Sequence, residues 1–125
     1  MATKLLWLAL AGALGTLARY GTGVLVERHA TGYFPWPTFA VNMAGCFLFG
    51  AFYAFAEERS GWTGETRFVV LTGFMGAFTT YSAFAHDTAA FMRESQWLLA
   101  ATNILAQNVL GVALLLIGIF VGKLL

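Results

Sequence analysis

Residues 73–84, which read GFMGAFTTYSAF, place glycines, hydroxyl groups and aromatic rings together in an otherwise apolar part of the chain. Gly73, Gly76 and the hydroxyls weaken helix propensity near the middle of an apolar segment. If the helix breaks here, backbone carbonyls lose their helical donors and could converge on a hard cation such as sodium. The alternative is a kink whose hydroxyls replace the lost hydrogen bonds, and propensity by itself supports only this kink.

Polar and aromatic side chains continue beyond this stretch. Tyr81 and Phe84 are spaced i, i+3, which puts them on one face of a helix. Aromatic pairs at this spacing are more often packing residues, but the positive edge of a ring can also face an anion. Ser82 and Asp87 extend the polar character of the same segment. We expect no metal site at the neighbouring His86, because no second nitrogen or sulfur ligand has a suitable spacing.

Two further polar residues lie inside apolar segments, where such groups usually face a protein interior or a watery path. Asn42, in VNMAG, offers two donors and one acceptor. It could make a structural hydrogen bond between helices or serve as an uncharged donor to an anion. Arg19, in GTLAR, could reach outward as a membrane anchor or add positive potential at the mouth of an anion path. Cys46 is the single cysteine and is predicted to be a packing residue.

The composition indicates that these residues lie in a membrane. The chain has 125 residues, of which 59% are hydrophobic and 10% are charged, and its mean hydropathy is +0.73. This is too little charge to cover a water-facing surface. The net charge of +1 is too small to indicate a basic surface that binds nucleic acid. A nucleotide-binding loop of the form GxxxxGK[ST] is also absent, so we expect neither nucleic acid nor nucleotide as a partner.

Charged and turn-forming residues divide the chain into apolar segments that are each long enough to cross a bilayer, which needs about 20 helical residues. These segments are about 4–26, 38–56, 67–91 and 97–122. The first could be a signal peptide, but its apolar pattern continues to Val26 and so favours a span. We predict an all-α membrane protein with four transmembrane helices in a single domain, residues 1–125.

The lysine and arginine residues favour one orientation in the membrane only weakly. Four spans place both termini on one side, near Lys4, Arg59, Arg67 and Lys123, while Arg28 and Arg93 lie near the other side. We therefore predict that the chain inserts in either orientation.

An oligomer is expected if the protein transports, because four thin helices cannot both enclose a pore and pack together. Small residues at helical spacing provide surfaces for close helix contact, either between subunits or within one. They are Gly12, Gly15, Gly45 and the pair Gly118-x-x-x-Gly122.

Three motifs together resemble the Fluc (also called CrcB) family of bacterial fluoride channels. They are GTLAR, PTFAVNMAG and GFMGAFTTYSAF, and the resemblance covers essentially the whole chain. The third motif, G-x-x-G-x-x-T-T-aromatic-S-x-F, is not a general membrane pattern. The resemblance implies an antiparallel, dual-topology homodimer with two fluoride pathways, in which the third helix is broken mid-span. It also implies a multi-pass location in the lipid of a bacterial cytoplasmic (inner) membrane.

The resemblance also implies particular site residues. A structural sodium ion at the dimer centre would be held by the backbone carbonyls of Gly76 and Thr79, and Arg19 would lie at the vestibule. The predicted fluoride pathway comprises Asn42, Tyr81, Phe84, Ser82, Thr38, Thr80, Asp87 and Asn108.

The chain departs from the family pattern at a few positions. Tyr81 replaces a phenylalanine, Ala83 a hydroxyl residue, Val112 a serine and Pro37 a glycine. Asn108 is predicted to supply the donor missing at Val112.

The resulting prediction is a channel, not an enzyme, that exports fluoride passively and protects the cell from its toxicity. One alternative is a proton-coupled small multidrug-type exporter, which needs a membrane-buried carboxylate. The first span has none, and Asp87 lies toward a helix end. Another is a non-transporting assembly subunit, which would have no reason to group Asn42, Tyr81 and Phe84.

Overall fold

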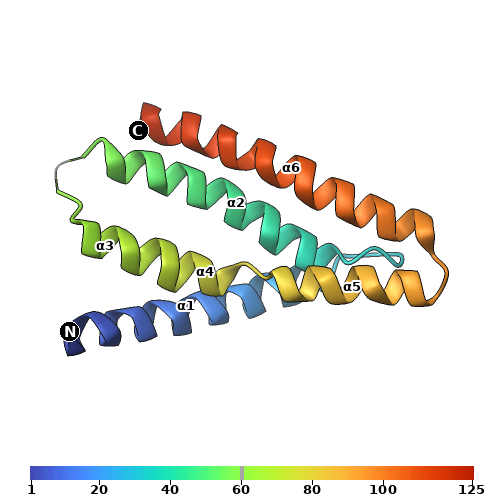
Figure 1. The fold of residues 1–125 in the computed structure, drawn as a ribbon. Helices are drawn as coiled ribbons and strands as arrows, with labels where there is room; N and C mark the ends of the chain where they lie inside the picture. Colours follow the sequence, from blue (N-terminus) through green and yellow to red (C-terminus); the bar gives the residue numbers. More distant parts are fainter. Residues whose placement is uncertain (60) are drawn as a thin grey trace.

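The computed structural model of the chain describes residues 1–59 and 61–125, and the regular structure in this part of the chain is helical. Four helical stretches are long and apolar enough to cross a membrane, which confirms the predicted all-α class with four spans. Both termini lie at the same end of the molecule (Figure 1). The elements are α1 (Ala2–Glu27), α2 (Trp36–Glu57), α3 (Gly64–Phe68), the π-helix η1 (Val69–Met75), α4 (Gly76–Phe78), α5 (Tyr81–Arg93) and α6 (Trp97–Leu124).

The third span is the only one of the four that is assembled from several pieces in the described residues. It runs through α3, η1 and α4, is interrupted at residues 79–80, and continues as α5. Its first half packs against α1, whereas α5 packs against α6. The interruption therefore lets one span change its neighbour partway across the bilayer, as the ribbon shows (Figure 1).

Helices α2 and α6 run side by side in close backbone contact. A Cβ atom added to Gly118 would collide with the carbonyl oxygen of Phe47, and one added to Gly50 would collide with that of Leu115. Gly122 approaches the carbonyl of Ala51 in the same way. Glycine is needed here because any side chain would push the two helices apart.

The other glycines with a predicted packing role also contact residues of the same chain. Gly15 on α1 lies against Phe74 of η1, Gly12 lies near Gly73, and Gly45 on α2 lies against Phe78 and Thr79. Of the two alternatives for these small residues, the structure thus shows packing within one subunit.

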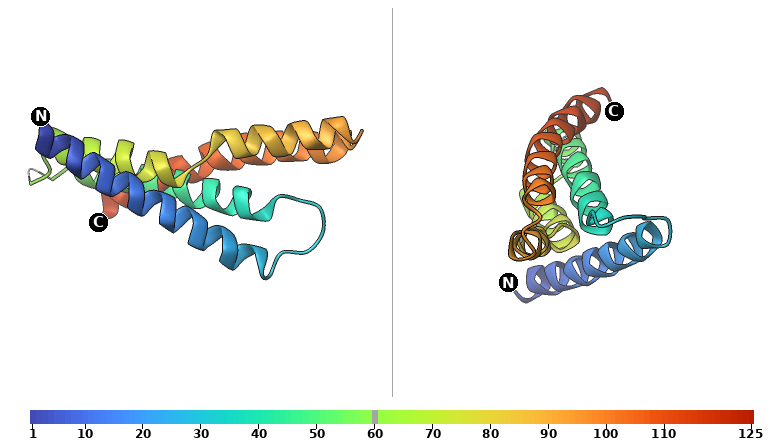
Figure 2. Two further views of the ribbon diagram at one scale, coloured as in Figure 1. Left: turned by 90° about the horizontal axis from the view of Figure 1, so that it is seen from below. Right: turned by 90° about the vertical axis from the view of Figure 1, so that its right-hand side faces the viewer.

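Large apolar side chains remain exposed on the single chain, mainly on α1 and α6. Figure 2 shows that α1 diverges from the rest of the molecule toward its C-terminal end. Such an apolar exterior is expected for a surface that faces lipid or another protein. Examples with more than half of their surface exposed are Leu5, Leu14 and Leu17 on α1, and Leu105, Val109, Val112, Leu116 and Phe120 on α6.

Candidate ion pathway at the broken third span

The interruption of the third span is a true break, because two successive residues leave the helical conformation. Thr79 (φ −82°, ψ 159°) and Thr80 (φ −146°, ψ 109°) are both extended. The Thr79 hydroxyl donates to the carbonyl of Met75 at 3.1 Å and so ends α4. The Thr80 hydroxyl accepts from the N–H of Ala83 at 3.2 Å and so caps α5. The two hydroxyls therefore define the ends of the break instead of repairing a kink.

The carbonyls of residues 76–79 lose their helical donors at this break, and Gly76 and Thr79 are two of these residues. In a regular helix Gly76 would accept from the N–H of Thr80, and Thr79 from the N–H of Ala83. Here the N–H of Thr80 donates to Asn42 Oδ1 at 2.8 Å, and that of Ala83 donates to Thr80 Oγ1. Gly76 and Thr79, which the family resemblance assigned to a sodium site, are thus among the residues whose carbonyls the break releases, and the sodium site itself stays a prediction.

Asn42 joins α2 to the break through both ends of its amide. Its Oδ1 accepts from the N–H of Thr80, and its Nδ2 donates to the carbonyl of Thr80 at 3.1 Å. The same Nδ2 donates to Gln107 Oε1 on α6 at 2.8 Å. Asn42 therefore makes the interhelical hydrogen bonds that were one of its two predicted roles.

A row of buried polar side chains continues from Asn42 along α6 to α5. Gln107 Nε2 donates to Asn103 Oδ1 at 3.2 Å, and Asn103 Nδ2 donates to Thr88 Oγ1 at 2.9 Å. Thr88 donates in turn to the carbonyl of Phe84 at 2.8 Å. We call Asn42, Gln107, Asn103 and Thr88 the amide relay. It links three helices inside the membrane.

Gln107, Asn103 and Thr88 were not among the residues predicted from the sequence, although the sequence contains a signal for two of them. Asn103 and Gln107 are spaced i, i+4 in an apolar span, so they share one helical face. Side-chain amides in such a span normally face a polar partner or a watery path. The structure buries both, with Asn103 0% and Gln107 9% exposed.

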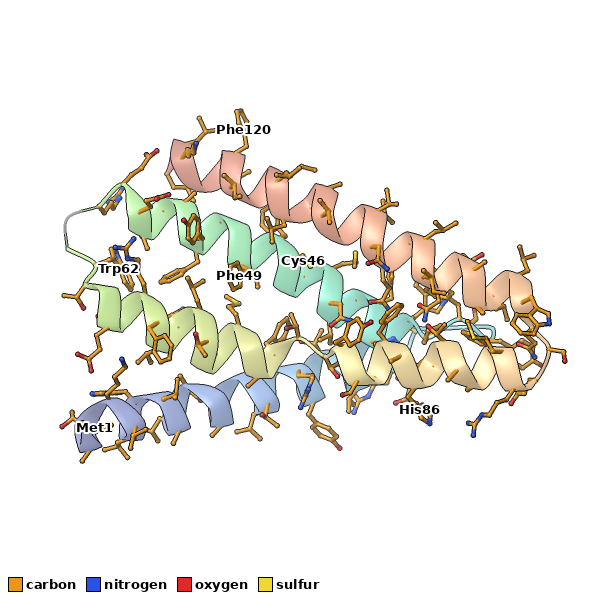
Figure 3. All side chains as sticks on the ribbon, viewed as in Figure 1. Met1, Cys46, Phe49, Trp62, His86 and Phe120 are labelled. Atoms are coloured by element: carbon orange, nitrogen blue, oxygen red, sulfur yellow. The ribbon has the colours of Figure 1, made fainter. Side chains whose placement is uncertain are left out.

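One groove beside the break holds the aromatic pair. It has a volume of about 320 Å³ and is bordered by Asn42, Thr80, Tyr81, Phe84 and Gln107, among others. Phe84 is 8% exposed and Tyr81 is 79% exposed, and their ring centroids lie 5.4 Å apart. Phe49 and Cys46 border the same groove from α2 (Figure 3). The residues lining this groove carry no charged side chain.

A second groove, of about 400 Å³, lies near the other predicted pathway residues. It is bordered by Arg19, Thr38, Thr80 and Ser82, and by the family departures Pro37 and Ala83. The hydroxyls of Thr80 and Ser82 are 3.3 Å apart. Thr80 borders both grooves, so both lie beside the break.

Two predicted pathway residues lie less directly on these grooves. Asn108 borders the first groove, but its Nδ2 donates to the carbonyl of Ile104 in its own helix at 2.7 Å. Asp87 borders neither of the two grooves, and its carboxylate lies 3.6 Å from His86 Nδ1. His86 is exposed and points away from α6 (Figure 3). In the described part of the chain, no cluster of three or more His, Cys, Asp or Glu residues could hold a metal.

The fold and the site together define a multi-pass membrane protein with a mostly uncharged polar track beside a broken helix. Comparison with known proteins then assigns it to a family. Residues 6–119 match the family described as "CrcB-like protein, Camphor Resistance (CrcB)". The chain therefore belongs to the CrcB family, as its three motifs indicated.

Similar proteins cover nearly the full length of the chain. A relative from Nitrosococcus oceani is 52% identical over 98% of both chains. A relative from Nitratidesulfovibrio vulgaris is 48% identical over 97% of this chain and 98% of its own. A relative from Desulforapulum autotrophicum is 45% identical over the full length of both chains. Each of the three is named "Fluoride-specific ion channel FluC".

Proposed function

We propose that this chain is a fluoride-selective channel that exports fluoride passively across the bacterial cytoplasmic membrane and so protects the cell from fluoride toxicity. The observation that carries this proposal is the uncharged groove beside the break, which amide, hydroxyl and aromatic groups line together. The fluoride-channel names of its full-length relatives support the same function.

Fluoride is small and holds its water tightly, so a selective path must replace that water with donors at close range. The hydroxyls of Thr80 and Ser82 and the side-chain amides of Gln107 and Asn108 on α6 lie along the two grooves. The positive ring edges of Tyr81 and Phe84 add weaker partners. Neutral donors bind the ion without trapping it, which conduction requires.

The working unit in this proposal is an antiparallel homodimer of dual topology that contains a central sodium ion. Sodium prefers oxygen ligands, and the carbonyls of Gly76 and Thr79 that the break releases suit it. Gly76 is exposed on the single chain, so a second, inverted copy could bring an equivalent pair of carbonyls to the same ion. When bound, sodium would supply structural cross-linking and positive potential near the anion path.

The direct test uses purified protein in liposomes loaded with either fluoride or chloride, each followed with an ion-selective electrode. We expect fluoride release on addition of an ionophore that balances charge, and chloride release no faster than from protein-free liposomes. Equal release of both anions would contradict the proposed selectivity. Release of neither anion, together with proton-driven uptake of a cationic dye, would instead indicate an exporter.

Replacing Gln107 with methionine is expected to slow fluoride release about tenfold. The substitution keeps the length of the side chain but removes the acceptor for Asn42 and the donor to Asn103. Leaving a buried polar group without its partner costs about 1–3 kcal/mol. The matched control is Leu105→Met on the same helix, because Leu105 is 63% exposed and lies away from the relay. Equal rates for the two variants would show that the relay does not support conduction.

A further inference from the structure

The backbone of Thr80 is paired in both directions with a single side chain from another helix. Its N–H donates to Asn42 Oδ1 at 2.8 Å, and its carbonyl accepts from Asn42 Nδ2 at 3.1 Å. Within a bilayer every backbone polar group needs a partner, because water is not available to replace one. The Asn42 amide therefore satisfies an extended residue that neither α4 nor α5 satisfies.

The same pairing controls the carbonyl of Gly76. In a continuous helix the N–H of Thr80 would donate to Gly76, and this carbonyl would not be free to bind a cation. Because Asn42 takes that N–H, the helical alternative loses its hydrogen bond and the extended conformation gains two. The choice between helix and break at this point is thus set by a residue that lies 38 positions earlier in the chain.

The backbone N–H of Thr80 fixes which way the Asn42 amide points, and the amide relay follows from that orientation. A backbone N–H can only donate, so Asn42 must turn Oδ1 toward Thr80. Its Nδ2 then faces Gln107 Oε1, which in turn directs Gln107 Nε2 at Asn103 Oδ1. Each amide fixes the next through to Thr88, and the interior members are buried. Both hydrogens of Asn42 Nδ2 already have acceptors, in Thr80 and Gln107.

We propose that Asn42 is the positioning residue that holds the third span open, and that it thereby keeps the Gly76 carbonyl available to the central cation. It acts through the backbone of Thr80, and this role is separate from that of an anion donor. The cation part of this inference rests on the sodium ion of the proposed function. The two hydrogen bonds between Asn42 and Thr80 do not depend on that ion.

The test measures two properties of the full-length protein in detergent. The first is hydrogen exchange at the Thr80 amide, followed by NMR with threonine labelled in its backbone nitrogen. The second is the rise in thermal midpoint when sodium replaces N-methylglucamine. For Asn42→Leu we expect Thr80 exchange to rise about tenfold, as loss of one buried hydrogen bond implies. We also expect the sodium-dependent rise in midpoint to disappear.

Two further variants separate this role from others. Gln107→Met cuts the relay beyond Asn42 but leaves both bonds to Thr80, so we expect slow Thr80 exchange and an intact sodium response. Asn42→Asp keeps an acceptor for the Thr80 N–H and should preserve most of its protection. If Asn42→Leu does not fold, this aspartate variant carries the test, and loss of Thr80 protection in it would overturn the proposal.

The possible failures are distinguishable. Wild-type exchange and a wild-type sodium response in Asn42→Leu would overturn the positioning role. A native protein that does not respond to sodium would overturn the cation part. Exchange at the Thr80 amide would still test whether Asn42 holds the Thr80 backbone. A native protein that responds to sodium but conducts no fluoride would contradict the proposed function and leave the positioning role intact.

Discussion

Replacing Phe84 with isoleucine is expected to lower fluoride release from liposomes by about 100-fold. The ring of Phe84 is 8% exposed, borders the uncharged groove and lies 5.4 Å from the ring of Tyr81. Its edge is one of few partners that a partly dehydrated anion would meet there. Removal of one preorganised donor from a dry site costs on the order of 100-fold in other systems. Isoleucine fills part of the space but has no polarised edge.

Phe91 provides a matched control for this substitution. It lies on the same helix, is also 8% exposed and borders neither groove. Phe91→Ile should therefore reproduce the loss of packing without the loss of conduction. Rates would be measured on equal amounts of folded protein, judged by gel filtration. If both variants conduct at the same rate, the ring of Phe84 is a packing group and the aromatic part of the pathway is wrong.

Replacing Gly118 with leucine is expected to prevent stable folding. A Cβ atom at this position would meet the carbonyl oxygen of Phe47 and the backbone nitrogen of Ala51. Overpacking a well-packed core usually costs about 1–3 kcal/mol and occasionally more. Here the obstructing atoms belong to the backbone of α2 and cannot move aside as a flexible side chain would. The midpoint of thermal unfolding and the yield of monodisperse protein are the measurements.

The control for Gly118→Leu is Ala101→Leu, which enlarges another small residue of α6 at an exposed position. We expect this variant to fold normally, because its new side chain enters lipid or detergent. A Gly118→Leu variant as stable as Ala101→Leu would show that α2 and α6 do not approach as closely as the structure indicates.

Several features could be predicted from local sequence because they depend on short segments. The length of each apolar segment indicated four spans, and the clustered glycines and hydroxyls of residues 73–84 indicated a kink or a break in the third. The position of Tyr81 and Phe84 on one face followed from helical spacing, and both border the same groove. Local spacing could also have revealed Asn103 and Gln107, because their i, i+4 separation is visible without a structure.

Other features depend on contacts between distant segments. The family resemblance gave the pathway residues as one set, whereas the structure distributes most of them between two grooves that both border Thr80. The sequence also left open whether the small residues pack within one subunit. The close approach of α6 to α2 in the structure shows that Gly118 and Gly122 pack within the chain.

The sequence by itself therefore determined the class of this protein, its four spans and the segment in which the third helix is weakened, because hydrophobic length and backbone propensity are local properties. Propensity left open whether this segment kinks or breaks. Only the tertiary structure decided what holds the break open. Asn42 reaches Thr80 across 38 positions and Gln107 across 65, and these bonds form only when helix packing turns the three residues toward one another. The rotation of each helix about its axis is set by its neighbours.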